Sequence, residues 1–127
     1  MRWWMILALV FAGYYIGRNF DLPEPLAFSR AHSNPTLSPA LDYYAGMVFY
    51  QRAEYPRAQK AFSQLLEDYP TAQYVPQALI RLEDSAEYNH DWDSARKAAH
   101  AYMEQFPKGA HIELMRRRLE LVDYQHP

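Results

Sequence analysis

The sequence predicts an all-α protein, in which a single N-terminal transmembrane helix precedes about five helices arranged as antiparallel hairpins. Three observations lead to this prediction. They are a charge-free apolar run near the N-terminus, an internal repeat at an offset of 37 residues, and prolines at the ends of the predicted helices. Together they divide the chain into an anchor over residues 1–20, a linker over residues 21–37 and a repeat domain over residues 38–127.

The composition is that of one folded domain with a membrane segment. The chain has 127 residues, of which 50% are hydrophobic and 22% charged. A net charge of -2 gives no broad positive field, so no nucleic-acid partner is expected. Cysteine is absent, which excludes disulfides, thiolate metal ligands and the lipid-bearing cysteine of a bacterial lipoprotein. We therefore expect attachment to a membrane through apolar residues.

The apolar run covers residues 3–17 and lies between Arg2 and Arg18. Fifteen helical residues rise about 22 Å, and extension to Phe20 gives about 27 Å, close to the hydrocarbon thickness of about 30 Å. We therefore expect residues 3–20 to contact the lipid bilayer as a single-pass anchor. The alternative is a signal peptide that is cleaved after a small residue.

The predicted linker over residues 21–37 contains three prolines and no sustained hydrophobic period. Neither a helix nor a strand is expected to continue through it. Fully extended, it reaches about 55 Å, far enough to hold the next domain away from the bilayer. Leu26 and Phe28 are expected to dock on the membrane or on a neighbouring membrane protein.

The internal repeat is the clearest signal in the sequence. Seven positions recur 37 residues later, and each stays apolar or proline. Their spacing of i, i+3, i+4, i+7, i+8 and i+11 forms one stripe on a helix that ends at the proline. The first copy has Ala58, Ala61, Phe62, Leu65, Leu66, Tyr69 and Pro70, and the second has Ala95, Ala98, Ala99, Tyr102, Met103, Phe106 and Pro107.

Each copy also has a preceding helix with a proline near its start, so the repeat unit is a helical hairpin. The hairpins are predicted over residues 38–70 and 74–107. One further helix, over residues 109–124, is expected to close the stack as a cap. Leu114, Leu121 and Val122 are expected to face inward.

The three consecutive arginines at residues 116–118 are expected to lie on a solvated face of the cap helix, because helical spacing distributes neighbouring side chains around the axis. Two i,i+4 ion pairs are expected on the same face. They are Glu113 with Arg117 and Arg116 with Glu120.

The first copy resembles the tetratricopeptide repeat. Gly46 is followed by Ala58 twelve residues later, Phe62 four later and Pro70 eight after that. In that family the small residues let two antiparallel helices approach closely. The resemblance implies a stack of hairpins that binds another protein.

The second copy departs from this pattern, since Glu83 holds the glycine position and Ala99 the aromatic one. The run over residues 61–72 is also similar to longer-period repeats of bacterial cell-envelope proteins, such as outer-membrane assembly lipoproteins and the periplasmic division coordinator. The resemblance covers residues 38–127. It implies a location in the cell envelope, for which we expect the bacterial inner membrane with the repeat domain in the periplasm.

In such repeats the first helix of each hairpin lines a concave groove. Tyrosine and methionine there provide adaptable apolar contact, and acidic residues favour a partner segment with Lys or Arg. The alternative for Met47 and Tyr50 is simple packing between hairpins. The matching positions are Tyr43, Met47, Tyr50, Gln51, Ile80, Asp84, Glu87 and Tyr88.

The predicted function is that of a membrane-anchored adaptor or scaffold, an accessory subunit of a larger membrane complex that binds a protein partner. The alternative is a self-assembling structural protein, a homo-oligomer in which the end near Tyr43 and Tyr44 packs on the next copy's cap helix. No enzyme activity, cofactor or metal is expected. His90, Asp91 and Asp93 form a candidate acid/base or metal cluster, but they lie in a predicted turn, where Asn and Asp are common.

Overall fold

The computed structural model describes residues 2–19, 26, 30 and 37–127. Within these ranges six helices and no strand occur, which confirms the prediction of an all-α protein. The helices are α1 (Arg2–Asn19), α3 (Leu37–Gln51), α4 (Tyr55–Asp68), α5 (Val75–Tyr88), α6 (Trp92–Gln105) and α7 (Ile112–Gln125).

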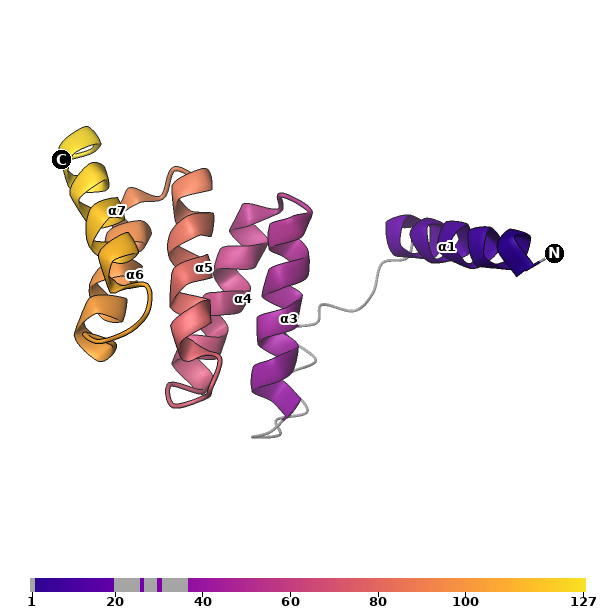
Figure 1. Cartoon of the computed structure of the whole chain (residues 1–127), viewed down its shortest axis with the longest axis horizontal. Coiled ribbons are helices and arrows are strands. Elements are labelled where there is room, and N and C mark those ends of the chain that lie inside the picture. Colours follow the sequence, from indigo (N-terminus) through magenta and orange to yellow (C-terminus); the bar gives the residue numbers. More distant parts are fainter. Residues whose placement is uncertain (1, 20–25, 27–29, 31–36) are drawn as a thin grey trace.

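Helix α1 lies apart from the other helices in Figure 1, and its side chains from Arg2 to Tyr15 are exposed. Among the described residues, no helix has the length and apolar character needed to cross a membrane. The predicted single-pass span over residues 3–20 is therefore not supported. Of the 18 residues of α1, both ends are polar, and the apolar part between Arg2 and Arg18 rises only about 22 Å.

The other five helices form a stack in which each packs on its neighbour along the chain. Helices α3 and α4 make one antiparallel hairpin, α5 and α6 make a second, and α7 closes the row (Figure 1). This tandem order confirms the predicted repeat of helical hairpins.

The two hairpin turns have the same backbone conformation. Ala53 and His90, which are 37 residues apart, both have left-handed backbones, with φ of 58° and 57°. In each turn the next N–H donates to the carbonyl five residues earlier, at 2.9 and 2.8 Å. This is the pattern of a helix that ends on a left-handed residue, and the repeat therefore extends to the backbone hydrogen bonds.

Gly46 is essential to the packing of the first hairpin. A Cβ atom placed on Gly46 would lie 2.6 Å from Cε1 of Phe62, whose ring is fully buried. No real side chain tolerates that separation, so glycine is needed where α3 crosses the ring of α4. In the second hairpin the equivalent positions, Glu83 and Ala99, are both buried.

Helix α7 packs with a different face from the one predicted. Leu114 and Leu121 are exposed, so their expected inward orientation is wrong, whereas Val122 is buried as predicted. Met115 and Leu119 join Val122 in the core. The spacing i, i+4, i+7 of these three residues is an equally good apolar stripe, and periodicity alone does not choose between two adjacent stripes on one helix.

Two described residues before α3 contact the first hairpin. Leu26 is buried in the core, and its carbonyl accepts a hydrogen bond from Nε2 of Gln64 at 3.0 Å. Arg30 pairs with Asp68 at 2.9 Å and with Glu67 at 3.3 Å. Leu26 therefore docks on its own domain and not on a neighbour. Phe28 and most of the predicted linker lie outside the described residues.

The burial of Leu26 shortens the tether to α1. Six residues separate Leu26 from Asn19, the last residue of α1, so that seven Cα–Cα steps join the two. Fully extended, they reach about 25 Å, less than half the length expected from the sequence. The first hairpin is therefore held close to whatever α1 binds.

Candidate functional site

The eight predicted groove residues lie on the first helices of the two hairpins, α3 and α5. Their role as a binding site stays a prediction, but their exposure differs. Gln51 and Tyr88 are exposed; Tyr43, Met47, Tyr50, Asp84 and Glu87 are half-buried; and Ile80 is buried.

Tyr50 connects α3 to α5. Its hydroxyl donates a hydrogen bond to Oδ2 of Asp84 at 2.8 Å, and the guanidinium of Arg81 lies 5.2 Å from the centre of its ring. Burial raises the pKa of Tyr50, and the accepting carboxylate of Asp84 adds to the shift. Tyr50 therefore contributes to packing between the hairpins, as the alternative interpretation expects.

A cluster of three tyrosines covers the end of this connection. Tyr55 of α4 stacks on Tyr88 of α5 at 4.7 Å between ring centres, and Tyr50 lies edge-on to both, at 5.9 and 6.4 Å. We call these three residues the tyrosine platform. The ring of Tyr88 is 57% exposed and offers apolar area to a partner.

Tyr43 has a packing role at the other end of α3. Its ring stacks on Tyr74 at 5.0 Å and lies 6.1 Å from the buried ring of Phe62. Tyr44 contacts the same pair edge-on, at 5.3 Å from Tyr43 and 6.1 Å from Tyr74. These rings bridge α3 and the segment that leads into α5.

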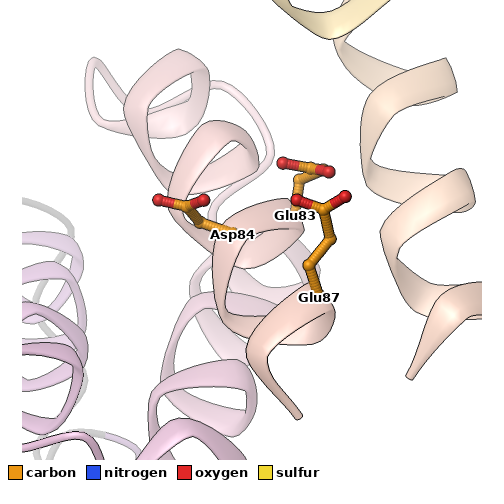
Figure 2. Close-up of side chains that lie close together, drawn as sticks. All are labelled: Glu83, Asp84 and Glu87. Atoms are coloured by element: carbon orange, nitrogen blue, oxygen red, sulfur yellow. The ribbon is translucent and has the colours of Figure 1, made fainter. Parts of the chain in front are cut away.

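An acidic cluster, Glu83, Asp84 and Glu87, occupies the C-terminal half of α5 (Figure 2). One carboxylate oxygen from each lies within 4.8 Å of the others, a separation that would suit a metal ion. Arg118 of α7 already supplies a cation, since its Nη1 donates to Oε2 of Glu83 at 2.7 Å and to Oδ1 of Asp84 at 2.9 Å. We therefore assign no metal to this cluster.

The solvated face predicted for residues 116–118 is wrong at Arg118, whose side chain is largely covered and paired with the buried Glu83. Arg116 remains half-exposed and pairs with Glu113, three residues earlier, and not with Glu120 as predicted. The helical positions explain the difference. Arg118 lies one residue before the buried Leu119 and faces α5, whereas Arg116 points to solvent.

The environment of Glu83 favours its neutral form. Burial raises the pKa of Glu83 from 4.5 to about 7; the hydrogen bond from Arg118 opposes this shift, and the charge of Glu87 adds to it. Glu83 therefore takes up or releases its proton near neutral pH. Asp84 is bonded to Tyr50 and Arg118, whereas the half-buried Glu87 lies against Glu83.

The residues around His90 have structural roles. Asp91 caps α6, accepting hydrogen bonds from Ser94 N–H at 3.3 Å and from Ser94 Oγ at 2.7 Å. The bond from Ser94 lowers the pKa of Asp91. Asp93 pairs with Arg96 at 3.0 Å. The candidate acid/base cluster therefore consists of a helix cap and an ion pair beside the left-handed His90.

A concave feature lies between α4 and α6. This apolar cleft of about 270 Å³ was not expected from the sequence. Two of its lining residues, Leu66 and Ala98, are members of the repeat stripe. The cleft is lined by Ser63, Leu66, Leu79, Leu82, Ser94, Lys97, Ala98 and Ala101.

The stacked hairpins, the left-handed turns and the small residue at the helix crossing define a repeat protein of the tetratricopeptide type. A family model described as YfiO, outer membrane lipoprotein, matches residues 37–118. The chain belongs to this family. Comparison with curated proteins and with solved structures gives no significant match. The chain differs from a lipoprotein in one respect, because its 127 residues include no cysteine.

Proposed function

We propose that the chain is a protein-binding adaptor of the cell envelope, an accessory subunit that binds a partner across the face formed by α3, α5 and α7. Membership of an outer membrane lipoprotein family supports the envelope location, and the tandem hairpins support protein binding.

The observation that carries this proposal is the network of Tyr50, Asp84 and Arg118. It connects one residue from each of the three helices through hydrogen bonds of 2.8 and 2.9 Å. A face fixed in this way loses little conformational entropy on binding. Beside the network lie Tyr88, which is exposed, and Glu87, which is half-buried.

The partner's chemistry follows from these two residues. The tyrosine platform provides aromatic area, on which an apolar or cationic side chain gains free energy. Glu87 accepts a hydrogen bond from a Lys or Arg of the partner. We propose a partner segment with a basic residue one helical turn from an apolar one, because Glu87 and Tyr88 lie next to each other on α5.

The proposal includes attachment to the inner membrane through α1. The large apolar side chains of this helix are exposed from Trp3 to Tyr15. Burying one such side chain in an apolar environment contributes about 1.5–3 kcal/mol. We propose that α1 inserts into the bilayer through these side chains.

Binding, not catalysis, is the proposed role. The acidic cluster of α5 and the residues around His90 are the described groups closest to a chemical site. In both places the carboxylates are used in ion pairs, a helix cap and interhelical hydrogen bonds.

Capture of the partner by the full chain in mild detergent tests the binding face. The double variant Glu87→Gln with Tyr88→Ala removes the half-buried carboxylate and the exposed ring. The matched control Glu104→Gln with Tyr124→Ala removes an exposed carboxylate and an exposed tyrosine elsewhere. We expect at least a tenfold loss of captured partner for the first pair only, with unchanged circular dichroism. Equal capture by both variants would contradict the proposal.

Membrane attachment is tested separately by gradient fractionation of cells. We expect the wild-type chain in the inner-membrane fraction. A variant with Leu9→Asp and Phe11→Asp, both exposed on α1, should appear in the supernatant. If this variant stays in the membrane fraction, α1 is not the attachment.

A further inference from the structure

The first helix of the stack has an exposed apolar face. We call the side chains Leu37, Leu41, Tyr44 and Val48 the outer face of α3. They are spaced by four, three and four residues, which aligns them along one side of the helix. Their exposed fractions are 67%, 38%, 59% and 54%. In Figure 1, α3 is the edge of the row of five helices.

This face carries no charge. Helix α3 contains no basic residue and one acidic residue, Asp42, which is buried and accepts a hydrogen bond from Gln64 at 3.3 Å. At the opposite edge of the stack, α7 exposes Arg117, Glu120 and Asp123 beside the apolar Leu114, Leu121 and Tyr124. The two edges of the domain therefore differ in charge.

The difference decides which surface can cover α3. If α7 of another copy packed on α3, Arg117 and Glu120 would lie against an uncharged apolar face, and burying charges without partners is costly. Two α3 helices meet without this cost. The spacing of four, three and four residues is that of the seam between two packed helices. A twofold pair uses the same patch on both subunits and is the commonest arrangement of homo-oligomers.

The area of the contact sets the conditions for pairing. Fifteen helical residues are about 22 Å long, so one helix covers on the order of 200–400 Å² per partner. A stable interface in solution needs about 800 Å² per partner. Two copies held on one membrane by α1 gain effective concentration, which compensates for the small area. The tether of about 25 Å keeps α3 close to that membrane.

We propose that the outer face of α3 is a homodimer interface, through which two copies pair when α1 holds both on one membrane. The membrane part rests on the proposed function. The pairing is independent of the tyrosine platform and leaves Tyr88 available to a partner.

Crosslinking of the full chain tests this inference, and the lack of native cysteine makes single-cysteine variants specific. Tyr44→Cys, near the middle of the outer face, is placed in vesicles of phosphatidylethanolamine and phosphatidylglycerol and treated with a short bismaleimide. We expect at least ten times more crosslinked dimer than for the control Leu121→Cys, which is exposed on α7. Adding Val48→Arg to Tyr44→Cys should remove the dimer.

Three results would overturn the inference. The first is that neither Tyr44→Cys nor Leu41→Cys gives a crosslinked dimer on vesicles to which the chain is bound. The second is a mixed crosslink between Tyr44→Cys and Leu121→Cys copies, which indicates stacking end to end. The third is a mixed crosslink between Tyr44→Cys and Leu9→Cys copies, which would show that α1 packs on the outer face of α3.

Flotation of the same vesicles separates this test from that of membrane attachment. A chain that does not float contradicts the proposed attachment through α1. Pairing is then read from sedimentation equilibrium at about 1 mM protein, a concentration typical of tethered modules. A dimer that Val48→Arg dissociates supports the α3 interface, and a monomer at this concentration overturns it.

Discussion

The two hairpins occupy equivalent places in the repeat but pack in opposite ways. In the first, the small Gly46 of α3 lies against the large, fully buried Phe62 of α4. In the second, the same positions hold a large residue on the first helix, Glu83, and a small one on the second, Ala99. Between the two hairpins the sizes of the two side chains are therefore exchanged.

The exchange has a consequence for the rest of the stack. An apolar ring fills the first crossing without further partners, but the carboxylate in the second is buried and needs a cation. Arg118 of α7 provides it at 2.7 Å. The polar crossing therefore connects the second hairpin to the cap helix. The crossing of the first hairpin needs no such cation, and its edge helix α3 is uncharged on the outside.

The largest expected effect is at the apolar crossing. Phe62→Ala should lower the free energy of unfolding by about 3–5 kcal/mol, because a fully buried ring leaves a cavity. The matched change in the second hairpin, Ala99→Gly, should cost about 1 kcal/mol, since it removes one methyl group from a helix. Urea unfolding followed by circular dichroism measures both. Similar losses for the two variants would show that the crossings do not differ.

The next largest effect concerns pH. The pKa of Glu83 in the folded chain is about 7, above the ordinary value of 4.5. The folded state therefore binds the proton more tightly, so the stability that this proton provides is complete below about pH 4.5 and lost as the pH rises through 7. The shift corresponds to about 3 kcal/mol. Urea unfolding of the wild type from pH 4.5 to 8 should show this decline.

Glu83→Gln serves as the control, because it keeps the shape of the side chain and removes the titration. The decline in its unfolding free energy over the same pH range should be smaller by about 3 kcal/mol. An identical pH dependence for the two proteins would mean that Glu83 is already ionised in the folded state throughout this range.

A smaller effect is expected at the two turns, where the hairpins are alike. Ala53 and His90 have φ of 58° and 57°, a region that costs a non-glycine residue about 1 kcal/mol. Ala53→Gly and His90→Gly should each raise the free energy of unfolding by about that amount. Thermal unfolding measures the gain. A stabilisation at only one turn would show that the turns are not equivalent.

The smallest effect separates two arginines of the cap helix. Arg116→Ala should change stability by less than about 0.5 kcal/mol, because its pair with Glu113 is exposed. Arg118→Ala should cost more, since it leaves the buried Glu83 without its cation. Hydrogen exchange of α7 amides distinguishes the variants. Equal protection in both would contradict the role assigned to Arg118.

The hairpin repeat could be predicted because it depends on local periodicity. The apolar stripe, the prolines and Gly46 all follow from spacing along one chain segment. The face with which α7 packs could not be predicted, because Leu114 and Met115 belong to adjacent apolar stripes of equal quality. Packing on α6 decides between them. The membrane span was predicted from the apolar middle of α1, but the helix as a whole, with its polar ends, is not long and apolar enough to cross a membrane.

The candidate site was predicted only in part for a similar reason. The positions on α3 and α5 follow from the repeat, but Tyr55 joins the platform from α4, and Arg118 reaches the acidic cluster from α7. Such contacts depend on how neighbouring helices are placed. One signal for Arg118 was present in the sequence, since an acidic residue at the glycine position of a repeat, Glu83, requires a basic partner.

Site-specific photocrosslinking tests the central claim, that the face of α3, α5 and α7 binds a protein partner. A photoreactive phenylalanine replaces Tyr88 on the platform in one full-length chain. In another it replaces Tyr124, which is exposed on α7 but lies about 120° around the helix from Arg118 and so outside the binding face. If this face binds the partner, position 88 gives a crosslinked adduct to one partner protein and position 124 gives none. An adduct from position 124 alone, or none from position 88 in a folded chain, would contradict it.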